Sequence, residues 1–215
     1  MFPLYDETPR HSFPFINYLL IAVNVFVFFI QIAAPNPEQF IYQYGFIPSE
    51  FNLFNPASYQ YIITSIFMHG GLFHIASNMW FLHIFGDNIE DRMGHVKYLL
   101  FYLAAGLIAT LSQYILDFSS GIPMIGASGA VSGVAGAYFV LFRNSKVKTL
   151  VPFFGFITLV DLSAGVVLGF WFISQVFSGL GSLTIVGQGG IAWLAHIGGF
   201  IFGNFIASAM KRSPA

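Results

Sequence analysis

Long uninterrupted apolar runs are the feature that most constrains how this sequence folds. Six of them approach the roughly 20 residues that an α-helix needs to cross a hydrocarbon core of about 30 Å. Within each run the apolar residues are continuous and do not alternate with polar ones, which disfavours a membrane β-barrel. The runs cover residues 15–34, 62–85, 96–116, 126–142, 162–177 and 190–210.

The scarcity of charge supports the same fold class. Charged residues make up 8% of the 215-residue chain, whereas soluble domains carry roughly 25%. So few charges cannot cover the surface of a globule of this size, and lipid must cover most of it. We therefore predict an all-α integral membrane protein, with residues 1–215 forming one polytopic domain of six transmembrane helices.

The basic residues indicate how this domain is oriented. All eight Lys and Arg residues fall on one side of a six-span arrangement, and the opposite loops, residues 35–61, 117–125 and 178–189, contain none. Because basic residues remain on the cytoplasmic side, both termini are predicted to be cytoplasmic. The basic residues are Arg10, Arg92, Lys97, Arg143, Lys146, Lys148, Lys211 and Arg212.

One further apolar run, residues 150–160, precedes the fifth predicted helix. It is either an interfacial segment or an extension of that helix. Asp161 at the junction favours the interfacial segment, because an aspartate inside a spanning helix is costly.

Composition also excludes several classes of partner. A net charge of −1 provides no basic field for nucleic acid. The absence of cysteine excludes disulfides, thiolate metal sites and a cysteine nucleophile. We expect no nucleic-acid partner, no cofactor and no metal.

The second run carries polar residues that are unusual inside a membrane. Ionisable side chains there cost about 3 kcal/mol when charged and unpaired, so they are functional candidates. His74 and Asn78 are four residues apart and share one helical face. His69 lies five residues before His74 and is close enough to join the same cluster.

Two further polar residues are predicted at a similar depth. Ser128 lies at the start of the fourth predicted helix and His196 near the start of the sixth. The small-residue pairs Gly129/Gly133 and Gly199/Gly203 would let these two helices approach closely in lipid. Close approach is what a hydrogen bond between Ser128 and His196 requires.

Acyl transfer is the chemistry that fits this set. His196 would act as the general base and Ser128 as the nucleophile. His74, Asn78 and the backbone N–H of Ser128 could donate to the oxyanion of a tetrahedral intermediate. No carboxylate is evident at this depth, so we predict a Ser–His dyad.

These residues form three motifs that together resemble the rhomboid family of intramembrane serine proteases. The resemblance implies a six-helix bundle with a water-filled active site that opens outward. It implies Ser128 as nucleophile, His196 as base, and His74 with Asn78 in the oxyanion hole, supported by His69. The motifs are His69-x4-His74-x3-Asn78, Gly126-x-Ser128-Gly129 and His196-x2-Gly199-x3-Gly203.

The same resemblance implies a class of substrate and a route to the site. Substrates would be single-pass transmembrane proteins, cut near the outer face of the membrane and reached through membrane lipid. Residues 179–190 would cap the site and the helix at 162–177 would form a lateral gate. With no targeting extension evident, we expect a bacterial cytoplasmic membrane.

The sequence departs from the family pattern at two places. Many relatives have a Trp-Arg pair in the first external loop, where this chain has Gln60 and Tyr61. Some members place an aromatic residue four positions after the nucleophile, where it stacks on the catalytic histidine. This chain has Ser132 there, so another group must orient His196.

Other functions fit less well. A zinc protease would need a motif such as HExxH, which is absent. An aspartyl protease needs two membrane carboxylates, and Asp161 is the only candidate. A channel or transporter remains an alternative, although the polar cluster does not continue to the inner face. A relative that binds transmembrane helices without catalysis is a third possibility.

Overall fold

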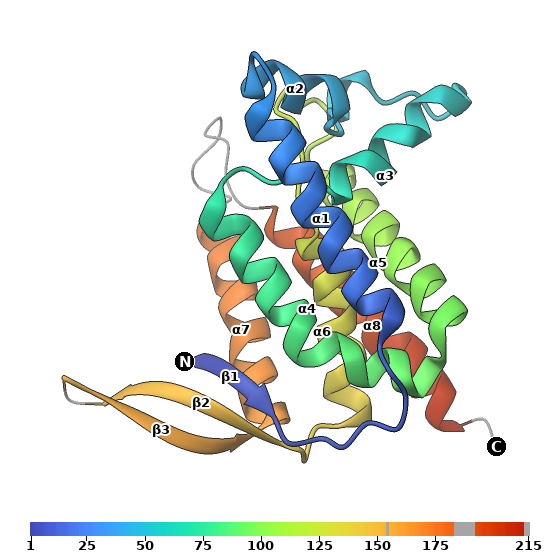
Figure 1. Ribbon diagram of the computed structural model, residues 1–215. Coiled ribbons are helices and arrows are strands. Elements are labelled where there is room, and N and C mark those ends of the chain that lie inside the picture. The colour runs from blue at the N-terminus through green and yellow to red at the C-terminus, as the bar shows by residue number, and fades with distance from the viewer. Residues whose placement is uncertain (154, 183–191, 213–215) are drawn as a thin grey trace.

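A helical bundle forms the body of the molecule (Figure 1). The computed structural model describes residues 1–153, 155–182 and 192–212. Helix α6 (Ser128–Leu141) lies at the centre and packs against its neighbours α4, α5, α7 and α8. The other long helices are α1 (Phe15–Ala33), α4 (Leu72–Met93), α5 (His95–Leu116), α7 (Ala164–Ser182) and α8 (Trp193–Arg212).

Several of these helices suit a membrane. Among the described residues, α1, α5 and α8 are each long and apolar enough to cross a bilayer, while α6 and residues Ala164–Phe177 of α7 form shorter apolar helices. The predicted membrane-embedded, mostly helical fold is therefore present. The count of six membrane crossings stays a prediction.

The predicted helix over residues 62–85 is wrong as a single element. The chain forms α3 (Gln60–Ile66), leaves the helical path, and begins α4 at Leu72. Gly70 and Gly71 lie in the break, and adjacent glycines disfavour a continuous helix because of their backbone entropy. His69 consequently lies in a connecting loop and not on the helix that carries His74.

A three-stranded antiparallel sheet corrects the all-α prediction. Strands β2 (Lys146–Phe153) and β3 (Phe156–Ser163) form a hairpin, and β1 (Phe2–Asp6) pairs with the other edge of β2. The run at 150–160 therefore does not extend the fifth helix. Its β-branched and aromatic residues favour strands, and Gly155, with φ of +86°, permits the turn.

The contact between α6 and α8 depends on glycine. A β-carbon at Gly199 would lie 2.1 Å from the carbonyl oxygen of Gly129, and one at Gly203 would lie 1.8 Å from that of Gly133. Neither position has space for a side chain. The close approach that the small-residue pairs predict is therefore present, and it brings the first turn of α8 beside that of α6.

The two ends of the bundle differ in what covers them. Figure 1 shows both termini and the sheet at one end, which we call the termini end. At the opposite end lie α3 and the short helix α2 (Pro37–Tyr44), with the 3₁₀ turns Pro48–Glu50 and Pro56–Tyr59 between them in sequence.

Buried polar side chains at the termini end tie the N-terminal segment to the bundle. The carboxylate of Glu90 is fully buried and accepts hydrogen bonds from the backbone N–H groups of Ile16 (2.9 Å) and Asn17 (2.6 Å), at the start of α1. It also contacts Nδ1 of His95 at 2.5 Å. Glu90 thereby supplies the acceptors that the first turn of a helix lacks.

A second network holds β1. The Asp6 carboxylate accepts hydrogen bonds from the Tyr138 hydroxyl (2.5 Å) and from the side-chain amide of Asn88 (3.1 Å). The Trp80 indole N–H donates to the Pro3 carbonyl at 2.7 Å. The first residues of the chain are thus bonded to α4 and α6.

Candidate active site

Ser128 and His196 meet at the contact between α6 and α8. Ser128 is the first residue of α6 and His196 lies in the first turn of α8. The Ser128 Oγ and His196 Nε2 atoms are 2.8 Å apart, which is hydrogen-bonding distance. The His196 side chain is buried and that of Ser128 is partly exposed. This geometry suits a nucleophile and its general base.

Gln175 of α7 completes the arrangement, and the sequence analysis missed it. Its Oε1 atom is 2.6 Å from Nδ1 of His196. An amide oxygen only accepts hydrogen bonds, so Nδ1 must carry the proton, and Nε2 then has a free lone pair facing Ser128. A lone glutamine inside the apolar run 162–177 was the signal that could have identified it.

The rings of Trp171 and Trp193 lie next to the imidazole of His196. The ring centre of Trp171 lies 6.1 Å from that of His196, and the ring centre of Trp193 lies 5.9 Å away at an interplanar angle of 87°. Ser132 instead donates its hydroxyl to the Ser128 carbonyl at 2.5 Å. The group that orients His196 is therefore supplied by α7 and α8.

His74 lies beside the nucleophile, over a glycine. A β-carbon at Gly126 would lie 2.7 Å from Nε2 of His74 and 3.6 Å from Oγ of Ser128. Gly126 has φ of +124°, a backbone conformation that is strained for any residue with a side chain. The backbone N–H of Gly70 donates to Nδ1 of His74 at 3.3 Å. Nε2 of His74 therefore carries the proton and is a donor next to Ser128.

Asn78 and His69 have polar atoms without partners. The side-chain nitrogen of Asn78 is buried, and it has no hydrogen-bond partner among the described residues. The same holds for both ring nitrogens of His69, whose ring centre lies 5.1 Å from that of His74. Gln31 of α1 holds the His69 backbone, donating to its carbonyl at 2.6 Å. Asn78 is one helical turn from His74, and it offers a spare donor.

The segment before α3 is attached to the bundle through Phe46. Its backbone pairs with that of Met124, and its buried ring lies 6.0 Å from the ring of Tyr114 on α5. Gln60 and Tyr61 begin α3. Of the predicted cap at 179–190, residues 179–182 form the end of α7 and the remainder lies outside the described residues.

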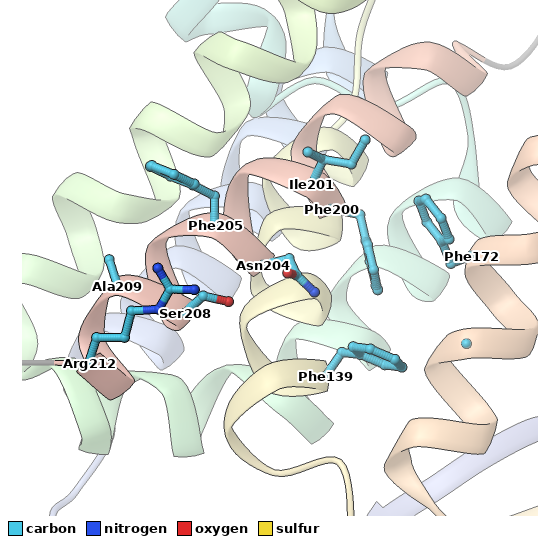
Figure 2. Close-up of a pocket in the computed structure, with 10 residues that line it drawn as sticks. Phe139, Phe172, Phe200, Ile201, Asn204, Phe205, Ser208, Ala209 and Arg212 are labelled. Carbon is cyan, nitrogen blue, oxygen red and sulfur yellow. The ribbon is translucent and has the colours of Figure 1, made fainter.

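A large cavity lies elsewhere, between α6, α7 and α8 nearer the termini end (Figure 2). Its volume is about 910 Å³, and the rings of Phe139, Phe172 and Phe200 line it, with Arg212 at its far side. Neither Ser128 nor His196 lines this cavity. The part of the chain that the structure describes contains no group of three or more His, Cys, Asp or Glu residues able to hold a metal.

Comparison with known proteins points to one family. The Rhomboid domain matches residues 56–213, which include every candidate site residue. The mitochondrial presenilin-associated rhomboid-like protein of Bos taurus is 29% identical over 195 residues, 86% of this chain and 45% of that protein. Rhomboid protease GluP of Bacillus subtilis (strain 168) is 29% identical over 206 residues, 94% of this chain and 36% of that protein.

A third relative matches a shorter stretch. The putative rhomboid protease YdcA of Bacillus subtilis (strain 168) is 33% identical over 88 residues, 40% of this chain and 44% of that protein. In each of these three matches the chain spans less than half the length of the relative.

Proposed function

Since the chain belongs to the rhomboid family, we propose that it is an intramembrane serine endopeptidase that cleaves single-pass transmembrane proteins near the outer face of the membrane. The observation that carries this proposal is the 2.8 Å contact between Ser128 Oγ and His196 Nε2, with Nδ1 of the same ring 2.6 Å from Oε1 of Gln175. Nucleophile, base and orienting group thus form a chain of hydrogen bonds, as in serine hydrolases.

In the proposed first step the Ser128 hydroxyl attacks the carbonyl carbon of the scissile peptide bond. Its proton passes to Nε2 of His196, while Gln175 keeps the other ring nitrogen protonated. Collapse of the tetrahedral intermediate breaks the C–N bond, and His196 returns the proton to the leaving amine. A water then attacks the acyl-enzyme by the same route and releases the second product with Ser128 restored.

The oxyanion that forms in each step needs donors already in place. We assign this role to Nε2–H of His74, the side-chain amide of Asn78 and the backbone N–H of Ser128. Three features support the assignment: the His74 proton position, the unpartnered Asn78 nitrogen, and the free N–H groups of a helix start. His69, Gly126, Gly129, Gly199 and Gly203 would hold these groups in position.

Orientation and location form part of the proposal. Basic residues segregate to the termini end, which favours a cytoplasmic position for both termini. The active site would then open toward the outer leaflet of a bacterial cytoplasmic membrane. Transmembrane proteins and lipid would be its partners.

Covalent labelling tests the mechanism directly. A fluorophosphonate probe is expected to label the wild-type protein in liposomes, and Ser128→Ala is expected to abolish both labelling and cleavage of a reporter transmembrane substrate. Ser132→Ala, one turn away, serves as the matched control and should retain labelling. Cleavage by Ser128→Ala at the wild-type rate would refute the serine mechanism. A wild-type protein that neither labels nor cleaves would favour a helix-binding relative without catalysis.

A further inference from the structure

The tip of the β2–β3 hairpin exposes large apolar side chains. Phe156 is 76% exposed, Ile157 75%, Phe153 63% and Leu159 54%. Between Thr149 and Val160 the chain has no ionisable side chain. A hairpin surrounded by water normally has polar residues on its solvent side, and a large exposed apolar patch marks a contact surface.

The base of the hairpin identifies which face lies toward the helices. Val147 is fully buried and belongs to the same packed core as Tyr138 of α6 and Ala164 of α7. Leu162, its cross-strand neighbour, packs against that core as well. One face of the sheet therefore rests on the termini end of a membrane-embedded bundle.

The same face continues beyond the bundle. Successive side chains on a strand alternate between faces, so Val151 and Phe153 share the side of Val147. Phe156, which pairs with Phe153, extends this face across the hairpin. Figure 1 shows the hairpin extending sideways past α7, with its outer half level with the lower turns of the helices. A bilayer that covers these lower turns would therefore bring lipid against this face.

The opposite face changes character along its length. Near the base Lys148 forms ion pairs with Asp161 and, at 3.9 Å, with Glu7. The hydrogen bond with Asp161 raises the pKa of the Lys148 ammonium, so Lys148 stays charged at neutral pH. Toward the tip the same face carries Leu159 and Ile157 in place of charges. The hairpin thus has an ionic base and a tip that is apolar on both faces.

The free edge of β3 limits how deep the tip lies. Within the described sheet, β3 pairs with β2 alone. An open strand edge is not tolerated in the hydrocarbon region, because its backbone N–H and C=O groups need partners. The headgroup region supplies such partners, and amphipathic helices that bind there bury their apolar faces by about 5–10 Å.

We propose that the β2–β3 hairpin is a membrane-interface anchor whose apolar tip inserts at the headgroup boundary of the leaflet at the termini end, with a phospholipid surface as its partner. In the proposed orientation this is the cytoplasmic leaflet. Because β3 leads directly into α7 at Ala164, the anchor fixes the depth of the helix that carries Gln175. The proposal does not depend on catalysis.

Spin labelling tests this depth, and a chain without cysteine suits it well. Phe156→Cys and Ile157→Cys, which lie on opposite faces of the hairpin, each carry one nitroxide in liposomes of neutral and anionic phospholipid. Lys146→Cys at the hairpin base is the aqueous control, and Leu100→Cys, 62% exposed on α5, is the lipid control. The measurement is the ratio of collision rates with oxygen, which concentrates in lipid, and with a water-soluble nickel chelate.

At both tip positions the oxygen-to-nickel ratio is expected to exceed that at Lys146→Cys several-fold and to approach that at Leu100→Cys. Ratios equal to the Lys146→Cys value at both tip positions would place the tip in water and overturn the proposal. Strong dipolar broadening between tip labels would also overturn it, because a second copy of the chain would then cover the patch. Either tip variant alone suffices if the other does not fold.

Discussion

Buried polar groups are paired very differently at the two ends of the bundle. At the termini end the Glu90 carboxylate has two backbone donors and His95, and Asp6 has Tyr138 and Asn88. Around the Ser128–His196 pair, the side-chain nitrogen of Asn78 and both ring nitrogens of His69 have no partner among the described residues. The carboxylates at the termini end are fully hydrogen-bonded, whereas the candidate site contains a buried donor without an acceptor.

This difference separates stability from chemistry. A buried donor without an acceptor costs about 1–3 kcal/mol, and at a catalytic site this cost is offset when a ligand or transition state supplies the acceptor. A fully bonded network stabilises the fold and has nothing left to offer a substrate. Substitutions at the site should therefore change rates, and substitutions at the termini end should change the free energy of unfolding.

The oxyanion donors should give the largest effect. His74→Ala and Asn78→Ala are each expected to lower kcat by roughly 10²–10³-fold, as removal of one oxyanion donor does in other enzymes. For Asn78→Ala the thermal unfolding midpoint should stay unchanged or rise, since the change removes a buried amide nitrogen that lacks a partner, and for the partly exposed His74 little change is expected. Reporter cleavage in liposomes and thermal denaturation measure the two quantities. Ser77→Ala, adjacent on α4, is the control. An unchanged kcat in both His74→Ala and Asn78→Ala would show that the unpartnered donors do not serve catalysis.

Glu90→Ala should show the opposite behaviour. It leaves the first N–H groups of α1 without their acceptor, and hydrogen bonds to a charged group contribute about 1.5–3 kcal/mol each. We expect the free energy of unfolding to fall by about 3 kcal/mol, while kcat below the unfolding transition is unchanged. Glu50→Ala, in the segment before α3, is the control. A lower kcat with normal stability would show that the two ends are not separable in this way.

Gln175 lies between these two groups of residues, because in the proposed mechanism it acts only through His196. Gln175→Leu removes the acceptor at Nδ1, and we expect kcat to fall roughly tenfold, part of the 10²–10⁴ that general base catalysis supplies. KM should not change. Gln175→Glu keeps an acceptor and should restore activity. Loss of activity in Gln175→Glu equal to that in Gln175→Leu would argue for a packing role.

Tyr138→Phe should give the smallest effect. It removes one hydroxyl from the Asp6 network and leaves the ring in place, so the free energy of unfolding should fall by about 1 kcal/mol. The kcat for the reporter should not change. Chemical denaturation in detergent micelles measures the difference, with Tyr42→Phe on the exposed face of α2 as the control. A change in kcat without a change in stability would mean that the network reaches the site.

Local signals in the sequence were sufficient for much of the fold and the site. Helix α5 covers the run predicted at 96–116, because length and continuous hydropathy define a spanning helix without help from neighbours. Ser128 and His196 were paired through their motifs and predicted depth, and the glycines that allow their helices to touch stand at regular spacing. These features depend on a few adjacent residues.

Features that depend on distant segments were missed. The break between α3 and α4 contains two glycines, and a hydropathy profile does not detect it because most of the residues around them are apolar. The sheet requires β1 to pair with β2, across more than 140 residues of chain. Gln175 has no motif, and its role depends on how α7 packs against α8.

The sequence by itself determined that this chain lies in a membrane and which serine and histidine to consider together. Composition and spacing carry that information because a bilayer selects residues by their own polarity, whatever the rest of the chain contacts. Only the tertiary structure decided the hydrogen-bond partners of His196 and His74, the unpartnered donor on Asn78 and the exposed apolar tip of the hairpin. Each of those depends on atoms from separate segments within hydrogen-bonding or van der Waals distance, which only packing brings together.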